Sequence, residues 1–453
     1  MPVPKQRSRL ILDVLLGILL LCAAAEFLLR GPVRFAHADS FNDYVSPYVQ
    51  TRAWMRGQDP YSLQNLVRFW PPDADHPEFL TRELADGSLA FKRGIPTAYP
   101  LSAFALNAPF ACLPWHVARK VWLLVLLLSF VVTVASVASA AKLRPGSRQS
   151  VFFFALVLAL APFHTALAAG SIVTVAVAAS AGAVWAAGRE RQVLAGSLLA
   201  VAVALKPQIG LPFLFYYVVR KRWRIAAVGS GVVAVLLAGA AGRLAISGTP
   251  WLQSYLYDNR VLFAPGSLGD FTEKNPLRFG LINFQVAAYA ILQNRAGAMV
   301  TAFVIATVAG IAWLLSLRKR KVEDEDKVRD TDLLSLSALA IISLLPIYHR
   351  FYDATLLIFP LAWSLTALRG RTSAIARGVL LTIIFVFLVP GAATIERLQA
   401  AGHFASVRNH WWWNMFVLPH ASWSIVLLTL LLLCALRKTM ANESRFQACG
   451  GHA

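Results

Sequence analysis

Long apolar stretches separated by short basic clusters are the dominant pattern along this chain. The first runs from Leu10 to Leu29, which is long enough to cross a bilayer core of about 30 Å and longer than the apolar part of a signal peptide. Similar stretches recur to the C-terminus, so we predict an all-α polytopic membrane protein of about 12 transmembrane helices. The predicted spans are residues 10–29, 117–140, 150–167, 171–187, 193–205, 207–219, 225–246, 296–317, 333–348, 354–368, 378–390 and 422–436.

The composition supports this class and removes others. Hydrophobic residues make up 57% of the 453 residues and charged residues 15%, and the mean hydropathy is +0.58, whereas a soluble protein is about a quarter charged. A soluble enzyme, a secreted disulfide scaffold and a disordered chain are therefore excluded. The formal net charge of +20 comes mostly from seven basic clusters between the apolar stretches, at residues 5–9, 142–148, 189–191, 220–224, 318–329, 369–377 and 437–445.

The basic clusters predict the topology through the positive-inside rule. Placing them in the cytoplasm puts both termini there and makes residues 318–331 a cytoplasmic charged loop. The chain then forms one membrane domain, residues 1–453, with outward loops at residues 31–98, 247–295 and 391–421. The large first loop is expected to carry short helices. Counted from Arg30 to Ala98 it has eight cations and eight anions, so the excess charge indicates topology rather than a nucleic-acid partner.

One apolar stretch does not fit this pairing. Residues 99–114 contain Pro100, Pro109 and Pro114, and we predict a partial or re-entrant helix there. If the stretch crossed fully, the number of spans between two basic clusters would become odd.

Polar residues gather at the start of the first outer loop. Asp43 follows the first span closely, so we expect it near the bilayer surface, where a carboxylate can act as a general base towards a hydroxyl. A helix cap or a solvated loop carboxylate is the alternative. Tyr48 and Arg52 follow on a helix predicted from Val45 to Met55, and Asp59-Pro60-Tyr61 is typical of a turn.

Two further polar segments interrupt apolar stretches. Lys206-Pro207-Gln208 places an ammonium at the outer boundary, where it can hold a phosphate or reach to lipid headgroups. The segment Tyr348-His349-Arg350-Phe-Tyr352-Asp353 is more polar than a short loop needs, which favours a functional role.

Other patterns carry less weight. Trp411 to Trp413 predict an interfacial aromatic belt, with sugar stacking as the alternative. Asp73-Ala-Asp75 is a DxD pattern, but no βαβ pattern or glycine-rich loop surrounds it, so we expect no metal site there. Cys22, Cys112 and Cys434 lack metal-ligand spacing, and we expect them to be small buried hydrophobes. His116 and His164 are expected to be structural.

Four segments in sequence resemble glycosyltransferase family 87, polytopic transferases of the GT-C superfamily that use polyprenyl-phosphate sugars, typically mannose. They are Asp43-Tyr44 through Asp59-Pro60-Tyr61; Tyr99-Pro100-Leu101 with Pro109 and Leu113-Pro114; Lys206-Pro207-Gln208 leading to Arg220 through Arg224; and Tyr348 through Asp353. Two positions depart from the family pattern. Gly170-Ser171 stands where many members have Gly-Gln, and Asn283-Phe-Gln285 follows a polar motif only loosely.

The resemblance implies a GT-C-type bundle and an inverting, metal-independent transfer without a cofactor, at the outer face of a bacterial inner membrane. It implies a polyprenyl-phosphate-linked sugar donor, a lipid or glycan acceptor and contact with membrane lipids. Asp43 would be the catalytic base, and Lys206, His349 and Arg350 would bind the donor phosphate. The substrate site would include Tyr44, Tyr48, Arg52, Tyr99, Gln208, Tyr352 and Asp353.

Two other functions stay open at this point. A transporter of lipid-linked sugars would carry its polar residues near the bilayer midplane, in broken helices of two related halves. A non-catalytic assembly subunit would not need these residues for chemistry. The polar residues cluster on one predicted side, beside the long outer loop, which favours the enzyme.

Overall fold

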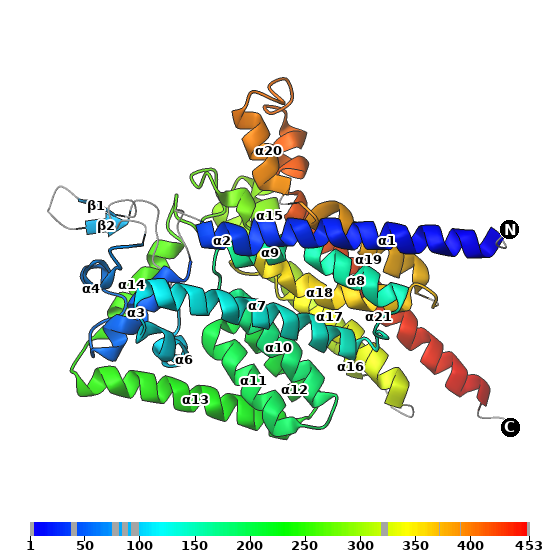
Figure 1. Cartoon of the computed structure of the whole chain (residues 1–453), viewed down its shortest axis with the longest axis horizontal. Coiled ribbons are helices and arrows are strands. Elements are labelled where there is room, and N and C mark those ends of the chain that lie inside the picture. Colours follow the sequence, from blue (N-terminus) through cyan, green and yellow to red (C-terminus); the bar gives the residue numbers. More distant parts are fainter. Residues whose placement is uncertain are drawn as a thin grey trace. The chain divides into compact units, whose positions relative to one another are not determined.

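Nearly every described segment of the chain is helical in the computed structural model (Figure 1), as the all-α class predicts. The structure describes residues 4–37, 43–74, 81–83, 89–91, 99–318, 325–370, 372–389 and 391–450. Strands β1 (Thr81–Glu83) and β2 (Leu89–Phe91) pair in antiparallel fashion. The chain divides into two compact units, each described by itself: unit 1 has residues 1–31, 134–165 and 282–453, and unit 2 has residues 32–133 and 166–281.

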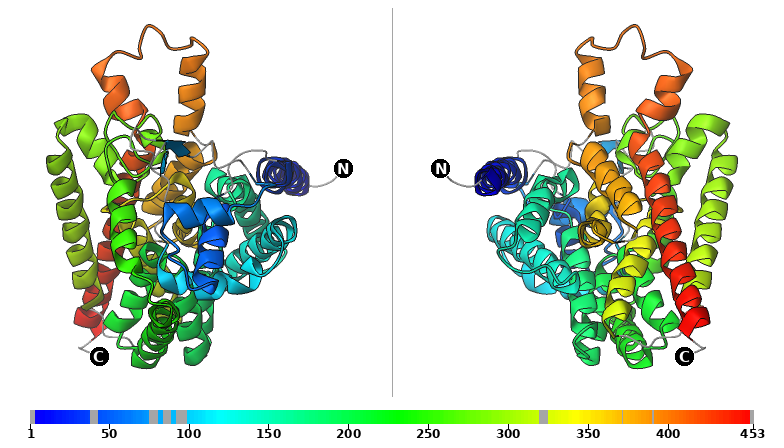
Figure 2. Two further views of the ribbon diagram at one scale, coloured as in Figure 1. Left: turned by 90° about the vertical axis from the view of Figure 1, so that its left-hand side faces the viewer. Right: turned by 90° about the vertical axis from the view of Figure 1, so that its right-hand side faces the viewer.

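Unit 1 is built mainly from the C-terminal third of the chain. Its elements are α1 (Pro4–Leu28), α8 (Arg148–Ala159), α15 (Phe284–Leu292), α16 (Arg295–Arg318), α17 (Glu325–Ile342), η3 (Phe351–Leu357), α18 (Ile358–Ala367), α19 (Ser373–Phe387), α20 (Gly391–Ala400), η4 (Trp413–Val417) and α21 (His420–Gly450). Helices α16, α17 and α19 all pack against α21 (Figure 2). The indole N–H of Trp313 on α16 donates to the Ser335 carbonyl on α17 over 2.9 Å, which ties these helices together in the apolar core.

Unit 2 contains the helices of the predicted first outer loop and a set of short apolar helices. Its elements are α2 (Arg34–His37), α3 (Val45–Met55), α4 (Leu63–Phe69), α6 (Leu101–Ala111), α10 (Val173–Ala187), α11 (Gln192–Leu205), α12 (Pro207–Val219), α13 (Trp223–Ile246), α14 (Trp251–Leu262) and η2 (Arg278–Gly280). The elements η1 (Leu29–Val33), α7 (Trp115–Ala140) and α9 (Ala161–Ala168) each begin in one unit and end in the other.

Small residues let α11 pack closely against its neighbours α10, α12 and α13. A Cβ at Gly210 on α12 would lie only 2.4 Å from the backbone nitrogen of Val203 on α11. The two helices therefore meet backbone to backbone directly beside the turn that joins them, and this contact fixes the turn.

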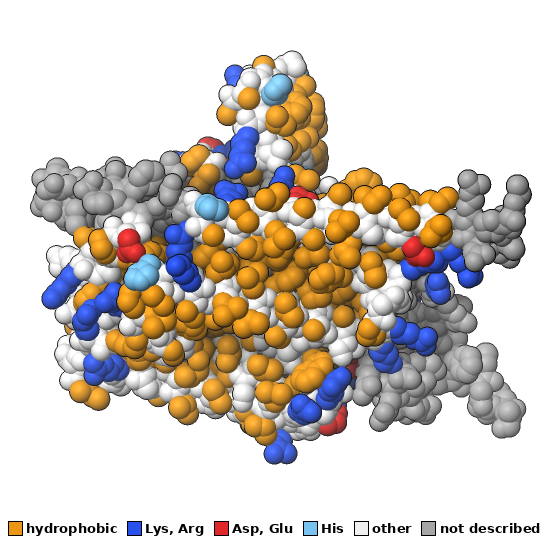
Figure 3. Space-filling model, viewed as in Figure 1, with side chains coloured by type: hydrophobic (Ala, Val, Ile, Leu, Met, Phe, Trp, Pro, Cys, Tyr) orange, Lys and Arg blue, Asp and Glu red, His pale blue; other side chains and the backbone are white. Residues whose placement is uncertain are grey.

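Six helices among the described residues are long and apolar enough to cross a membrane, or seven if α8 and α9, which meet at a 47° bend, form one span. They cover Arg9–His37, Trp115–Ala140, Trp223–Ile246, Arg295–Leu317, Ser373–Ala400 and His420–Thr439. Figure 3 shows hydrophobic side chains along the exposed side of α1, the first of these helices. Such helices fit a membrane protein.

The predicted count of twelve spans is not confirmed by helix length. Helices α10, α11 and α12 have 15, 14 and 13 residues, so each rises about 20–22 Å against a bilayer core of about 30 Å. The predicted partial helix at residues 99–114 is α6, whose 11 residues include Pro109. The helix predicted from Val45 to Met55 is confirmed with these bounds as α3.

Ion pairs join neighbouring basic clusters within each unit. In unit 1, Arg148 Nε and Nη2 donate to the carboxylate of Asp13 over 2.6 and 2.8 Å, and Arg148 also donates to the Arg9 carbonyl. In unit 2, Arg222 binds Glu190 through both terminal nitrogens, at 2.8 and 3.0 Å. Clusters that the charge pattern places on the same side of the membrane therefore meet in both units.

The prediction that the cysteines are buried is wrong. Cys22, Cys112 and Cys434 are all exposed on the structure, because each lies on the outward side of its helix or at a helix end. The tryptophan run divides: Trp411 is 68% exposed, whereas Trp413 is 7% exposed and packs against Phe404 with ring centroids 5.0 Å apart.

Candidate active site

Asp43 lies just before α3 in unit 2 and is held there by its neighbours. Its backbone N–H donates to the Ala169 carbonyl over 2.8 Å. Tyr44 stacks on Trp122 of α7, with ring centroids 4.0 Å apart and planes 9° from parallel. The Trp122 indole N–H in turn donates to the Gly170 carbonyl over 2.9 Å. The start of α3, α7 and the turn between α9 and α10 thus hold the backbone of Asp43 in one place.

The surroundings of Asp43 bear on the alternatives for this residue. Tyr44 is the N-cap residue of α3, and its own side chain makes no capping hydrogen bond. Asp43 is 8% exposed, so it is not a solvated loop carboxylate. A carboxylate this deeply buried is unusual enough to indicate a function.

Tyr48 connects Asp43's helix to the junction between α6 and α7. Its hydroxyl donates to the Leu113 carbonyl over 2.7 Å and accepts from Arg52 Nη1 over 3.0 Å. Its ring lies 5.1 Å from that of Trp115. Burial raises the pKa of the Tyr48 phenol, so the hydroxyl stays protonated and positions Arg52, the next residue on that face of α3.

A cavity of about 600 Å³ opens beside Arg52. Its walls come from α3, α4, the segment after α4 and the α6–α7 junction: Arg52, Arg56, Arg68, Phe69, Trp70, Pro71, Pro72, Asp73, Cys112, Leu113, Pro114, Trp115 and His116. Of these, only Arg52 was singled out from the sequence as a substrate-site residue. The spacing of Arg52 and Arg56, one helical turn apart on α3, is the signal that could have found the second arginine.

Lys206 forms the turn between α11 and α12. The residue is 7% exposed, its backbone has φ −149° and ψ 87°, and Pro207 begins α12. The Lys206 carbonyl accepts from the N–H groups of Ile209 and Gly210, over 2.9 and 3.1 Å, which closes the turn. Gln208, in the first turn of α12, is half-buried.

Helix α11 sets the distance of Lys206 from the basic cluster that precedes the helix. It rises about 21 Å over its 14 residues, starting next to Arg189 and Arg191. The position of Lys206 at the outer boundary of the membrane stays a prediction. Its ammonium is tolerated because the residue is buried inside the protein.

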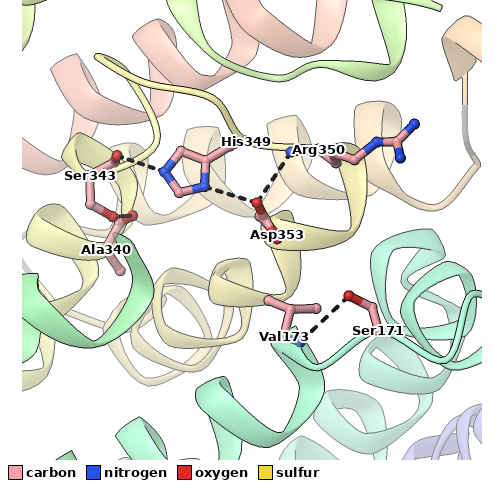
Figure 4. Close-up of polar contacts among 7 residues, drawn as sticks. All are labelled: Ser171, Val173, Ala340, Ser343, His349, Arg350 and Asp353. Atoms are coloured by element: carbon pink, nitrogen blue, oxygen red, sulfur yellow. Dashed lines mark hydrogen bonds and ion pairs between the residues drawn. The ribbon is translucent and has the colours of Figure 1, made fainter. Parts of the chain in front are cut away.

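His349 and Asp353 form a closed pair in unit 1 (Figure 4). Both side chains are fully buried, and His349 Nδ1 lies 3.0 Å from Asp353 Oδ2. His349 Nε2 lies 3.1 Å from the Ser343 carbonyl, an atom that can only accept. Nε2 therefore carries a proton, and the bond between Nδ1 and Asp353 requires a further proton on one of the two partners.

Arg350 begins the short helix η3 and is anchored through its backbone. Its N–H donates to Asp353 Oδ2 over 3.2 Å, while the Asp353 N–H donates back to the Arg350 carbonyl over 2.8 Å. The guanidinium points away from Asp353 (Figure 4) and lies 5.9 Å from the ring of half-buried Tyr352. The loop thus buries its histidine and carboxylate and projects its arginine.

A second segment of unit 1 supports this loop. The Ile282 N–H donates to the His349 carbonyl over 3.0 Å, and Gln285 Nε2 donates to the Pro346 carbonyl over 3.1 Å. Asn283, fully buried, donates to Gln285 Oε1 over 3.2 Å. Sequence reasoning treated Asn283 and Gln285 only as a loose motif, yet they hold the His349 loop in place.

Tyr99 belongs to an aromatic cluster in unit 2. Its carbonyl accepts from the Tyr61 hydroxyl over 2.6 Å, and the Tyr61 ring packs 5.0 Å from that of Tyr255 on α14. Asp59 Oδ1 accepts from the Tyr61 N–H over 2.9 Å, and burial raises the pKa of its carboxyl. Asp258, which the sequence did not single out, is 5% exposed; burial, and then the charge of Asp59, raise its pKa to about 8.

The predicted site residues fall into four groups. Three lie in unit 2: Asp43, Tyr44, Tyr48 and Arg52 on and beside α3; Lys206 with Gln208 at the α11–α12 turn; and Tyr99 in the aromatic cluster around Tyr61. Residues 349–353 form the fourth group, in unit 1. Within the described ranges, no three His, Cys, Asp or Glu side chains gather as metal ligands. Asp75 of the DxD pattern lies outside the described residues, and metal-independent transfer stays a prediction.

Several long apolar helices fit a membrane protein, and ionisable side chains buried at helix breaks are typical of one that handles a polar substrate. The model of the family described as Glycosyltransferase family 87 matches residues 97–345, more than half of the chain. The chain belongs to glycosyltransferase family 87. No curated protein and no solved structure matches it.

The matched stretch covers only part of the predicted site. Lys206 and the supporting residues Asn283 and Gln285 lie inside it, whereas Asp43 lies before it and His349 after it. The family therefore identifies the chain as a glycosyltransferase, and the roles of Asp43 and the His349 loop depend on their own geometry.

Proposed function

We propose that the protein is an inverting glycosyltransferase of the GT-C type that transfers a sugar, with mannose as the favoured one, from a polyprenyl-phosphate donor. The acceptor would be a lipid or glycan at the outer face of a bacterial inner membrane. The protein itself would be a membrane bundle of about 12 helices. The observation that carries the proposal is Asp43: a buried carboxylate, backbone-anchored, directly after the first long apolar helix of a chain in this family.

The chemistry assigned to Asp43 is a single displacement. Its carboxylate accepts the proton of an acceptor hydroxyl as the hydroxyl oxygen attacks the anomeric carbon of the donor sugar. The bond from that carbon to the phosphate oxygen breaks on the opposite face, so the configuration inverts and polyprenyl phosphate leaves. A donor whose reactive carbon lies next to a membrane-bound phosphate fits a base placed just outside the first span.

Negative charge grows on the leaving phosphate during this step, and fixed cations stabilise it. We assign that role to Lys206, at the α11–α12 turn, and to Arg350, whose guanidinium extends from its loop. Direct phosphate binding by His349, expected from the sequence, would require a hydrogen bond to Asp353 or Ser343 to break. His349 and Asp353 are therefore proposed as positioning residues that hold Arg350.

A transporter of lipid-linked sugars is the second candidate, and one observation favours it. Lys206 lies at a break between two short helices, about 21 Å along α11 from the nearest basic cluster, and substrate sites of transporters use such breaks. A translocation assay in vesicles separates the two, because replacement of Asp43 should stop sugar transfer without stopping translocation.

The direct test is an assay of the full chain in proteoliposomes with polyprenyl-phosphate mannose and an alkyl mannoside acceptor. Asp43→Asn removes the base while keeping the size of the side chain, and we expect transfer to fall by roughly 10²–10⁴-fold. Asp13→Asn is the matched control, because the Asp13 carboxylate is exposed and pairs with Arg148 on α8. This variant should retain full transfer. Near-normal transfer by Asp43→Asn would remove Asp43 from the mechanism.

A further inference from the structure

The cavity beside α3 is strongly cationic. Arg52, Arg56 and Arg68 line it, and Asp73 is the one acidic residue among the walls that the structure describes. Among the described residues, none of the three guanidinium groups forms a salt bridge with a carboxylate. Three guanidinium groups facing one cavity repel one another, so their excess over the single described carboxylate favours an anionic occupant.

Aromatic rings hold these arginines and leave their hydrogen-bond donors available. The Arg56 and Arg68 guanidinium groups lie 4.6 and 5.6 Å from the ring centre of Phe69. Arg52 lies 5.5 Å from the ring of Tyr48 and gives one N–H to its hydroxyl. A ring face fixes a guanidinium without accepting a hydrogen bond from its planar edge, and each guanidinium has five N–H donors in a fork that suits phosphate.

The remaining walls suit a sugar. They include aromatic and proline side chains, among them Trp70, Pro71 and Pro114. A volume of about 600 Å³ is typical of a pocket for an organic ligand and exceeds what a lone anion needs. The lining therefore matches a phosphorylated sugar headgroup.

The location of the cavity favours the acceptor over the donor. Helix α3 begins at Val45, two residues after Asp43, and Arg52 lies seven residues further on, which corresponds to about 10 Å along a helix. Helix α3 therefore has the base beside its first turn and Arg52 towards its other end, and the acceptor is the substrate whose hydroxyl must reach the base. Lys206 and Arg350, assigned to the donor phosphate, do not line this cavity.

We propose that Arg52, Arg56 and Arg68 form a binding pocket for a phosphate-type anion carried by the acceptor. The assignment to the acceptor rests on the proposed transferase function, whereas binding of the anion itself does not. The anion is a phosphodiester of a lipid headgroup or a phosphate on a glycan, since both present the same oxygens to the arginine forks.

Binding is tested through Cys112, which is exposed and lines the cavity. With Cys22, Cys434 and Cys449 replaced by serine, the rate of maleimide labelling of Cys112 reports occupancy of the pocket. The probes are inorganic phosphate, mannose 6-phosphate, unphosphorylated mannose, and nanodiscs of phosphatidylglycerol or of phosphatidylcholine. Slower labelling with mannose 6-phosphate identifies a glycan phosphate as the source, and slower labelling only in phosphatidylglycerol identifies a lipid headgroup.

Charge-neutralising variants give the expected magnitude. Arg56→Gln and Arg68→Gln should each weaken protection by the phosphate probe roughly tenfold, the effect of losing a charge-assisted hydrogen bond. Arg224→Gln is the control, since this exposed arginine on α13 lies outside the cavity, and it should bind like the wild type. Equal labelling of the wild-type protein with and without all phosphate probes would overturn the pocket.

The link to the acceptor is tested separately in the transfer assay. The acceptors are two alkyl dimannosides, one with and one without a phosphodiester between sugar and alkyl chain. The wild type should have the lower KM for the phosphodiester, and Arg56→Gln should raise that KM towards the value for the neutral acceptor, whereas Arg224→Gln, outside the cavity, should keep the wild-type preference. An unchanged preference in Arg56→Gln would refute the acceptor assignment alone, whereas normal transfer by Asp43→Asn would refute the proposed mechanism and leave anion binding standing.

Discussion

Two buried carboxylates, one in each unit, show opposite surroundings. Asp353 in unit 1 is fully buried with His349 Nδ1 3.0 Å away and the Arg350 N–H bonded to the same oxygen. Asp258 in unit 2 is 5% exposed, the charge of the Asp59 carboxyl raises its pKa further, and its Oδ2 has no hydrogen-bond partner among the described residues. One carboxylate is stabilised by its neighbours and the other is destabilised by them.

The difference distinguishes two uses of a buried charge. A partnered carboxylate such as Asp353 organises a loop, because its loss leaves the histidine uncompensated. A carboxylate without a partner, like Asp258, takes up a proton instead, because burial penalises only its charged form. The partners of each buried charge therefore decide whether it organises the fold or takes up a proton.

Removal of Asp353 should give the largest change in stability. Asp353→Ala leaves His349 buried without its partner and takes away the acceptor of the Arg350 N–H, and loss of one member of a buried pair costs about 3–5 kcal/mol. The change is measured as the melting temperature of the purified full chain in detergent, where each kcal/mol corresponds to about 2–4 °C or less. Asp13→Asn, which breaks an exposed pair with Arg148, should leave the melting temperature nearly unchanged. Equal shifts in the two variants would show that burial of the His349 pair has no energetic consequence.

Asp258 should produce a smaller effect of opposite sign. Its pKa is about 8 in the folded protein and about 3.9 in the unfolded chain, so between these values the folded state holds a proton that the unfolded state has released. The free energy of unfolding therefore falls as pH rises from about 4 to 8, and Asp59, whose pKa burial also raises, acts in the same direction.

Asp258→Asn removes this ionisation. At pH 8.5 the variant should be more stable than the wild type, and the gain should shrink towards pH 5. Melting temperatures at pH 5, 7 and 8.5 measure it. The prediction fails if the difference between variant and wild type is the same at all three pH values.

The sequence predicts local features of this fold better than its long-range arrangement. Helix α3 begins and ends at the predicted residues, and the breaks at Lys206-Pro207 and at 99–114 are where proline places them. The number of spans could not be predicted in the same way, since α10 to α12 are too short to cross alone. Hydropathy does not distinguish a helix buried among other helices from one that faces lipid.

The site shows the same limit. Asp43, Lys206 and His349 stand out because a charge next to an apolar stretch is rare. The second bonded ring nitrogen of His349 depends on the Ser343 carbonyl. The Tyr48 hydroxyl that holds Arg52 depends on its own hydrogen bond to the Leu113 carbonyl. Those partners are distant or featureless in the sequence. Arg56 and Arg68 resemble ordinary loop cations, and only folding of α4 against α3 brings them to one ring.

Replacement of Arg56 should give the smallest change in stability, and it extends the comparison of the two buried carboxylates to a cation. The side chain contacts Phe69 and, among the described residues, no carboxylate, so Arg56→Gln removes repulsion and a cation–π contact of similar size. We expect its free energy of unfolding to lie within about 0.5 kcal/mol of that of the wild type, while binding of phosphate probes weakens roughly tenfold. Thermal unfolding with and without mannose 6-phosphate measures both effects in one experiment: at the same ligand concentration, the wild type should be stabilised more than the variant. A variant that is destabilised as strongly as Asp353→Ala would mean that Arg56 supports the fold rather than a ligand, because only a partnered charge contributes stability when no ligand is present.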